Sequence, residues 1–345
     1  MVDMAKFLCA FLILFYHYFS EYGNLSGLLA EALSSYAIAV ALFMGISGFL
    51  TFQKLEGVDT RKERWTYIQG QVCRILKIYL LWSIVYILYN ISRWDFSDLS
   101  IQFVLFQLRN WIFNSTFYTI WFMPALAFGL LATFLITEFL PKWTAIMLAV
   151  LLYIIGTLQL TYVSVGNLIP GFAHLSEFSV AWLGGARGWL FYGFPLIMVG
   201  RYMAKFYAKR PNYGTKSWLG WMGLSVLSVG LMLGEALTLR HFCGSTGIDM
   251  TVMMPISTFC ILGFLLCVKL PEGKYLIWMR KLSVLIFLTQ RIFLTVIPDL
   301  LPQTVEDYIF ANRFVSFFFV CGGTILFSAG ILVLSKKMKW LRLLY

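Results

Sequence analysis

The chain has 345 residues, of which 60% are hydrophobic and only 12% are charged, and its mean hydropathy is +0.79. A soluble protein would carry roughly 25% charged residues, so this composition excludes the soluble class and indicates a polytopic membrane protein. The net charge of +11 fits membrane topology and attraction to anionic lipid headgroups. We expect no nucleic-acid partner.

Hydropathy predicts the membrane-spanning elements in chain order. Windows of about 20 apolar residues predict about ten spans, and each should be a helix because backbone in lipid needs internal hydrogen bonds. The predicted spans are residues 4–20, 30–53, 67–91, 118–139, 143–163, 187–206, 217–238, 251–270, 282–298 and 312–335. The expected fold is therefore an all-α membrane helical bundle, with residues 1–345 forming a single transmembrane domain and no separate soluble domain.

Loop charges predict the orientation of these spans. Lys and Arg are retained in the cytoplasm, and every second predicted span is followed by basic residues. They include Lys54, Arg61, Lys62 and Arg64, then Lys142, Lys209, Arg280 and Lys281, and finally Lys336 and Lys337. The opposite loops carry Glu21, Glu177 and Asp299. We therefore predict cytoplasmic termini and a multi-pass protein of a bacterial cytoplasmic membrane, with membrane lipids as partners.

The first predicted span contains a cation and a histidine in an otherwise apolar run, K-FLCAFLILFY-H. Lys6 and His17 are eleven residues apart, which is close to three helical turns and about 16 Å of rise. Both side chains should lie on one face, and ionisable groups at membrane depth usually face a bundle interior or a wet cavity. The alternative is that Lys6 is an interfacial anchor and His17 a satisfied packing residue.

The third predicted span carries Arg74 and Lys77, an i, i+3 pair on one helical face. With Lys6 they would form a cytoplasmic cluster suited to a polyanion such as a nucleotide-bearing pyrophosphate. Ordinary snorkelling to the membrane surface is the alternative. The following segment, residues 99–114, alternates apolar and polar residues at helical spacing and predicts an interfacial helix on the outer surface.

The later spans carry few ionisable residues near the outer face. Glu235 ends the seventh span and Asp249 precedes the eighth, and they would either form structural ion pairs with Arg187 or Arg240 or bind a hydroxylated acceptor. His174 and His241 fall in outer loops, which leaves His17 as the histidine placed to act at depth. The six cysteines show no metal-ligand spacing, and we predict neither a disulfide framework nor a metal site.

The chain also excludes several kinds of catalytic machinery. Its longest stretch outside the predicted spans, residues 164–186, is too short for a domain. It has no GxxxxGK[ST] phosphate-binding loop and no GxSxG nucleophile elbow. Chemistry must therefore come from helix residues. A histidine can take a proton from a hydroxyl at neutral pH, which is the usual general-base role in acyl transfer. A cation cluster with a histidine farther along the same cavity matches a reaction across the membrane, with the donor entering from the cytoplasm and the acceptor from outside.

Six segments, in order along the chain, resemble the membrane-bound acyltransferase 3 superfamily, which acylates sugars, peptidoglycan and related surface polymers. They are VDMAKFLCAFLILFYH, ALFMGISGFLTF, RILKIYLLW, TIWFMPALAFGLL, GARGWLFYGFPLIMVG and LSVLIFLTQRIF. The resemblance covers nearly the whole chain. Within the superfamily the segments are most similar to the membrane half of vancomycin-resistance serine and alanine racemases.

The resemblance implies roles for particular residues. Lys6 and Arg74 would help to hold the acyl donor, usually acetyl-coenzyme A, and His17 would be the catalytic base. Lys77, one turn after Arg74, is expected to contact the donor with them. The expected substrate-binding residues are Trp121, Arg187, Glu235, Asp249 and Gln290. Thr119 and Gln290 stand where many members have histidine, and Lys6 stands where Arg is commoner. These departures indicate a different acceptor, or a loss of catalysis in favour of binding or transport.

The sequence therefore predicts a membrane O-acyltransferase. It would move an acyl group, expected to be acetyl, from cytoplasmic acyl-CoA to a hydroxyl of an extracytoplasmic cell-surface carbohydrate or similar acceptor, with no metal. The alternative is a transporter of serine or another small polar solute, related to the membrane half of the racemases, in which buried charges form the substrate or proton pathway.

Overall fold

The computed structural model describes residues 1–22, 37–93, 100–117, 119–209, 217–243, 249–268 and 273–345. Within these ranges the chain forms helices and no strand, which confirms the all-α fold class. The α-helices are α1 (Val2–Tyr22), α3 (Ala37–Leu55), α4 (Arg61–Ser92), α5 (Ile101–Phe113), α6 (Phe122–Phe139), α7 (Lys142–Leu160), α8 (Val163–Gly166), α9 (Phe172–Trp182), α10 (Phe194–Ala208), α11 (Trp218–Cys243), α12 (Met254–Cys267), α13 (Lys274–Arg291), α14 (Ile297–Leu300), α15 (Gln303–Ala311), α16 (Arg313–Phe317) and α17 (Gly323–Leu334). Short π-helical turns occur at η3 (Trp189–Gly193), η4 (Ile292–Val296) and η5 (Phe318–Gly322), and η6 (Lys339–Leu344) is a 3₁₀ helix.

The long helices agree with the hydropathy prediction. In the described part of the chain, 8 helical stretches are long and apolar enough to cross a membrane. Two predicted spans contain shorter helices: residues 187–206 hold η3 and α10, and residues 251–270 hold α12. The start of predicted span 30–53 lies outside the described residues. The helix predicted over residues 99–114 is present as α5, which has no buried residue.

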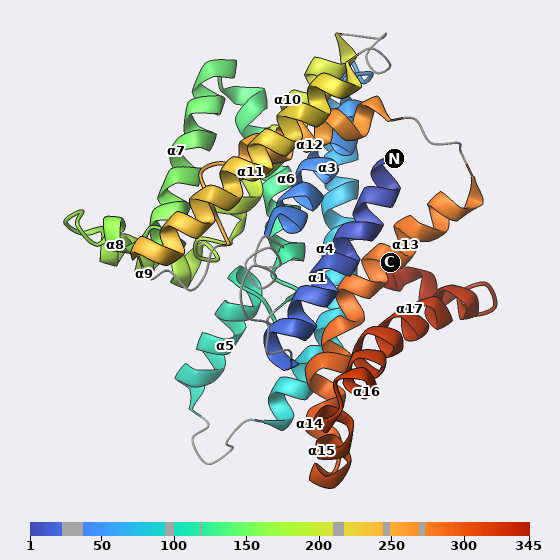
Figure 1. Ribbon diagram of the computed structural model, residues 1–345. Coiled ribbons are helices and arrows are strands. Elements are labelled where there is room, and N and C mark those ends of the chain that lie inside the picture. The colour runs from blue at the N-terminus through green and yellow to red at the C-terminus, as the bar shows by residue number, and fades with distance from the viewer. Residues whose placement is uncertain (23–36, 94–99, 118, 210–216, 244–248, 269–272) are drawn as a thin grey trace. The chain divides into compact units, whose positions relative to one another are not determined.

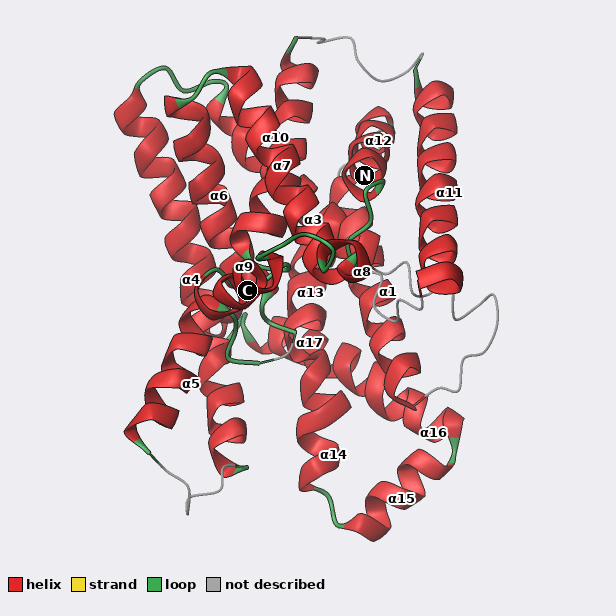
Figure 2. Ribbon diagram, turned by 90° about the vertical axis from the view of Figure 1, so that its left-hand side faces the viewer, coloured by secondary structure: helices red, strands yellow, loops and turns green. Residues whose placement is uncertain are grey.

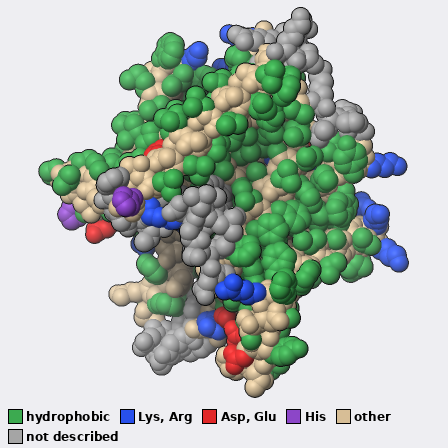
Figure 3. Space-filling model, in the orientation of Figure 1, with side chains coloured by type: hydrophobic (Ala, Val, Ile, Leu, Met, Phe, Trp, Pro, Cys, Tyr) green, Lys and Arg blue, Asp and Glu red, His purple; other side chains and the backbone are tan. Residues whose placement is uncertain are grey.

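The surface of these helices is largely apolar. Exposed leucine, isoleucine, valine and methionine side chains line α4, α7 and α11, among them Leu80, Ile84, Met147, Val150 and Val226. On the face drawn in Figure 3, hydrophobic side chains predominate, and Lys and Arg side chains stand at its right-hand edge. Such a surface would aggregate in water and is suited to lipid, so the chain is a multi-pass membrane protein.

The chain divides into two compact units, one formed by residues 1–40 and 270–345 and the other by residues 41–269. In the first unit α1 packs along α13, and α13 packs along α17, as Figure 1 shows. Polar groups join these apolar helices: Thr289 and Ser328 hydroxyls lie 2.9 Å apart, and the Tyr18 and Ser316 hydroxyls 2.7 Å apart. These contacts fix the register of α1 and α17 against their neighbours.

In the second unit α4, α6, α7 and α10 lie side by side (Figure 2). The backbones of α3 and α10 approach each other closely at glycine residues. A Cβ added at Gly200 would overlap the carbonyl oxygen of Gly45, and one at Gly48 would lie 2.5 Å from the carbonyl oxygen of Ile197. Small residues allow such close packing between membrane helices. The GISG segment of α3 is therefore a packing surface for α10.

Candidate functional site

The first unit contains a charged cluster in which His17 and Arg291 are buried and Glu21 is exposed. His17 and Glu21 are one turn apart on α1, and Arg291 is the last residue of α13. The Arg291 Nη2 lies 3.2 Å from His17 Nδ1, and Arg291 Nη1 forms an ion pair with the Glu21 carboxylate. His17 is 9% exposed and Arg291 4%. The packing of α1 on α13 thus joins residues 270 or more positions apart into one network.

The Arg291 contact determines which nitrogen of His17 accepts. A guanidinium has only donors, so Nδ1 of His17 accepts from Arg291, and the neutral imidazole carries its proton on Nε2. Arg291 Nη1 also donates to Thr295 Oγ1 at 3.5 Å. Arg291 therefore orients the imidazole ring, and Glu21 holds the guanidinium in place.

Gln290 is fully buried in the same unit. Its Nε2 donates to the carbonyl of Phe287 at 3.0 Å, while Oε1 is enclosed and has no hydrogen-bond partner among the described residues. Lys6 is half-buried near the start of α1, on the same helix as His17 as predicted. Arg74 and Lys77 are exposed on α4 in the second unit. The structure thus gathers His17, Glu21 and Arg291 within the first unit.

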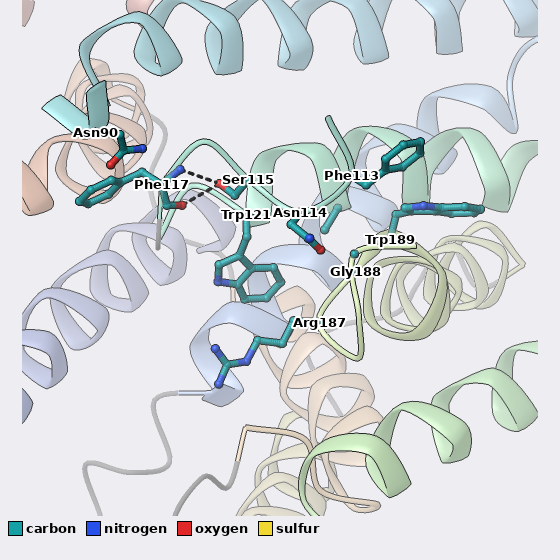
Figure 4. Close-up of a pocket in the computed structure, with 11 residues that line it drawn as sticks. Asn90, Phe113, Asn114, Ser115, Phe117, Trp121, Arg187, Gly188 and Trp189 are labelled. Carbon is teal, nitrogen blue, oxygen red and sulfur yellow. Dashed lines mark hydrogen bonds between the residues drawn. The ribbon is translucent and has the colours of Figure 1, made fainter. Parts of the chain in front are cut away.

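The second unit contains a cavity of about 490 Å³. It is lined by Asn90, Phe113, Asn114, Ser115, Phe117, Trp121, Ala125, Gly184, Arg187, Gly188 and Trp189. Figure 4 shows Trp121 and Arg187 in its wall together with the amide side chains of Asn90 and Asn114. The cavity thus combines flat aromatic rings, amides and one cation, which suits a polar molecule with an apolar face.

Two glycines and an ion pair fix Arg187 in this wall. Gly184 and Gly185 adopt positive φ angles of 83° and 62°, which glycine reaches without steric cost. Arg187 follows this turn and forms an ion pair with Asp249. The Trp121 ring packs edge-on against Tyr192, with centroids 5.5 Å apart. The pairing of Asp249 with Arg187 is one of the two alternatives that the sequence left open.

Glu235 has a different environment from Asp249. Its carboxylate accepts from the backbone N–H groups of Val252 at 2.6 Å and Met253 at 2.9 Å, just before α12, and from the Tyr162 hydroxyl. A carboxylate at a helix N-terminus satisfies unpaired N–H groups and interacts favourably with the helix dipole. Glu235 therefore ties α11 to the start of α12.

We predict that Glu235→Gln lowers the free energy of unfolding by about 1–2 kcal/mol, because it removes the charge that caps α12. Thermal unfolding in detergent measures this loss. Glu177→Gln is the matched control, since the side chain of Glu177 is 78% exposed. An unchanged melting temperature with a raised acceptor KM would instead assign Glu235 to substrate binding.

Sequence reasoning missed several of these residues. Glu21 was counted only as a loop charge, although its position one turn after His17 was visible in the sequence. Arg291 was recognisable as an ionisable residue within a span, without a partner. Asn90 and Asn114 gave no signal, because a polar residue near a span end is common. In the part of the chain that the structure describes, no three His, Cys, Asp or Glu residues gather as metal ligands.

Comparison with known proteins identifies the family. The acyltransferase 3 family, described as an acyltransferase domain, matches residues 2–333. No curated protein and no solved structure matches the chain significantly. The family match covers nearly all of the helical chain described above and includes both the His17 cluster and the cavity. The chain therefore belongs to the acyltransferase 3 superfamily and is a membrane acyltransferase.

Proposed function

We propose that the protein transfers an acyl group, acetyl in the simplest case, from cytoplasmic acyl-CoA to a hydroxyl of an extracytoplasmic carbohydrate or similar acceptor. The observation that carries this proposal is the buried His17 held by Arg291 and Glu21. A general base needs an imidazole held in a fixed orientation, and Arg291, itself paired with Glu21, fixes the orientation of His17. In the proposed reaction Lys6, Arg74 and Lys77 contact the donor phosphates, and Trp121, Arg187, Asp249 and Gln290 contact the acceptor or line its path.

The proposed chemical step uses His17 as base. The imidazole takes the proton of the acceptor hydroxyl, whose oxygen attacks the thioester carbonyl carbon. The carbon–sulfur bond breaks, the acyl group stays on the acceptor oxygen, and the imidazolium returns its proton to the departing thiolate. Nδ1 of His17 accepts a hydrogen bond from Arg291, so the guanidinium must move away from Nδ1 before that nitrogen can take the proton. The Glu21 carboxylate would remain the ion-pair partner of Arg291 during this step.

The test is acyl transfer by purified protein in liposomes. Labelled acetyl-CoA is supplied on one side, and label is measured in a hydroxylated acceptor, such as a cell-wall oligosaccharide, on the other. The proposal requires label transfer that depends on both substrates. Saturable serine uptake without any acyl donor, in the absence of label transfer, would support the transporter alternative.

Arg291 provides a sharper prediction within this proposal. Arg291→Lys keeps the charge and loses the planar fork that contacts His17 and Glu21 together. Misplacing a catalytic group by about 1 Å can cost roughly 10²-fold, so we expect kcat to fall by that order with the donor KM unchanged. Arg280→Lys, on the same helix and half-exposed, is the control. A fall in kcat of equal size for both variants would contradict the positioning role.

A further inference from the structure

Arg201 is a buried cation without a polar partner. It lies on α10, is 4% exposed, and among the described residues makes no hydrogen bond or ion pair. The Nε atom of Arg201 is fully enclosed. Its guanidinium lies over the Phe52 ring, with a distance of 4.7 Å between Cζ and the ring centroid. Burying a charge costs several kcal/mol, and a desolvated cation–π contact stabilises by about 2 kcal/mol or more. The charge of Arg201 is therefore offset only in part by its surroundings among the described residues.

The close packing of α3 and α10 fixes the position of this charge. Gly200 precedes Arg201 and lies against the backbone of Gly45 on α3. Phe52 stands two turns farther along α3 and is 1% exposed. The helix that carries Arg201 and the ring beneath its guanidinium are thus held together by backbone contact, so the guanidinium has little freedom to find a partner elsewhere.

Other charges surround Arg201. The groups that act on it electrostatically include Arg64, Glu56 and Glu138, and Arg64 also acts on Lys205 one turn farther along α10. Arg64 forms an ion pair with Glu138. The Nε of Arg64 is also enclosed without a hydrogen-bond partner. The cations near Arg201 therefore outnumber the carboxylates Glu56 and Glu138, and the Nε atoms of Arg64 and Arg201 have no hydrogen-bond partner among the described residues.

This arrangement favours a phosphate group as ligand. Arginine is suited to phosphate because its planar fork matches two oxygens at once. A phosphate monoester carries close to two negative charges and three terminal oxygens, so it can neutralise the excess cation and accept from both guanidiniums. A single carboxylate offers less charge and fewer acceptors.

The site lies at the end of the second unit that the sequence assigns to the cytoplasm. Arg64 is in the first turns of α4, after the basic loop that follows α3, and Arg201 and Lys205 are in the last turns of α10. We propose that Arg201, with Arg64 and Lys205, binds a phosphate group of a cytoplasmic ligand, either a phosphate of the acyl donor or the headgroup phosphate of a lipid. Only the naming of the donor rests on the proposed function.

Binding measurements in nanodiscs test this site. Wild-type protein in phosphatidylcholine is titrated with unacylated coenzyme A and, separately, with inorganic phosphate at fixed salt. We expect Arg201→Gln to raise the dissociation constant of coenzyme A at least 10-fold. Lys209→Gln should leave it unchanged, since this variant removes an exposed cation one turn beyond Lys205.

A second arm identifies a lipid source. In nanodiscs that contain phosphatidic acid, native mass spectrometry counts the lipids retained by each variant. If only lipid retention depends on Arg201, the phosphate belongs to a lipid and the donor binds elsewhere.

Other outcomes separate the phosphate site from the proposed donor. If coenzyme A binds wild type and Arg201→Gln equally, and lipid retention is also equal, the phosphate site is wrong while the proposed donor stands. If coenzyme A never binds but retained phosphatidic acid depends on Arg201, the site stands and the proposed donor fails.

Thermal unfolding separates this role from a structural one. Without phosphate, Arg201→Gln should melt at the same temperature as wild type or higher, because it removes a buried charge that makes no hydrogen bond or ion pair among the described residues. Phosphate should raise the melting temperature of wild type but not of Arg201→Gln. A lower melting temperature for Arg201→Gln without phosphate, with equal binding, would make Arg201 a structural cation. If Arg201→Gln does not fold, Arg201→Lys carries the test, and its loss of the fork should weaken coenzyme A binding several-fold.

Discussion

Replacing His17 with glutamine is expected to lower kcat for acyl transfer by about 10²–10⁴-fold, the usual contribution of a general base. Glutamine keeps a hydrogen-bond acceptor that can face Arg291, so the buried guanidinium retains a partner and the protein should fold. It cannot take up a proton. The donor KM should change little, because His17 touches the reacting hydroxyl and not the donor phosphates in the proposed mechanism.

His174→Gln is the matched control for this experiment. The His174 side chain is 89% exposed on α9 and its charged neighbour is Glu177, 3.7 Å away. It should keep full activity. If His17→Gln transfers acyl groups at more than a tenth of the wild-type rate, His17 does not act as the base, and the cluster has a structural or transport role.

Gly200→Ala is expected to lower the free energy of unfolding by about 3 kcal/mol, the upper end of what overpacking costs. The added methyl group would overlap the Gly45 carbonyl oxygen and lie 2.5 Å from the Phe49 nitrogen. Both are backbone atoms, which cannot rotate away as a side chain can. The helices must therefore separate, and the position of Arg201 over Phe52 changes with them. Thermal unfolding in detergent and the yield of monodisperse protein measure the effect.

Gly223→Ala on α11 is the control for Gly200→Ala. A Cβ at Gly223 meets no atom within 4 Å. Alanine is favoured over glycine within a helix by about 0.5–1 kcal/mol, so this variant should be as stable as wild type or slightly more. Equal destabilisation by both substitutions would mean that helix propensity, and not the contact between α3 and α10, governs stability here.

Much of the fold could be predicted because the membrane allows few solutions. A long apolar segment in lipid must be a helix, so hydropathy alone located most of the long helices. Hydropathy did not give the bounds of α10 and α12, because these helices, with 15 and 14 residues, are shorter than the predicted spans that contain them. In those regions the apolar run continues through a π-helical turn or a non-helical segment, and hydropathy does not distinguish these from helix.

The candidate site was predictable only where one helix carries it. The shared helix of Lys6 and His17 followed from spacing, because both residues lie on α1. The pairing of His17 with Arg291 did not, since it depends on how α1 packs against α13. Likewise, Arg74 and Lys77 were conspicuous as a pair in the sequence but are exposed. Arg64 and Arg201 act on each other electrostatically, although they lie on different helices, α4 and α10. Spacing along one helix carries no information on such long-range contacts.

The packing of α1 against α13 also bears on how the protein is made. Glu21 and Arg291 are 270 positions apart, and chains are synthesised from the N-terminus at about 5–20 residues per second. During synthesis His17 and Glu21 on α1 therefore lack their contacts with Arg291 until α13 has left the ribosome. A nascent chain that ends before Arg291 lacks the group that orients His17, so the His17 cluster is complete only after α13 has been made.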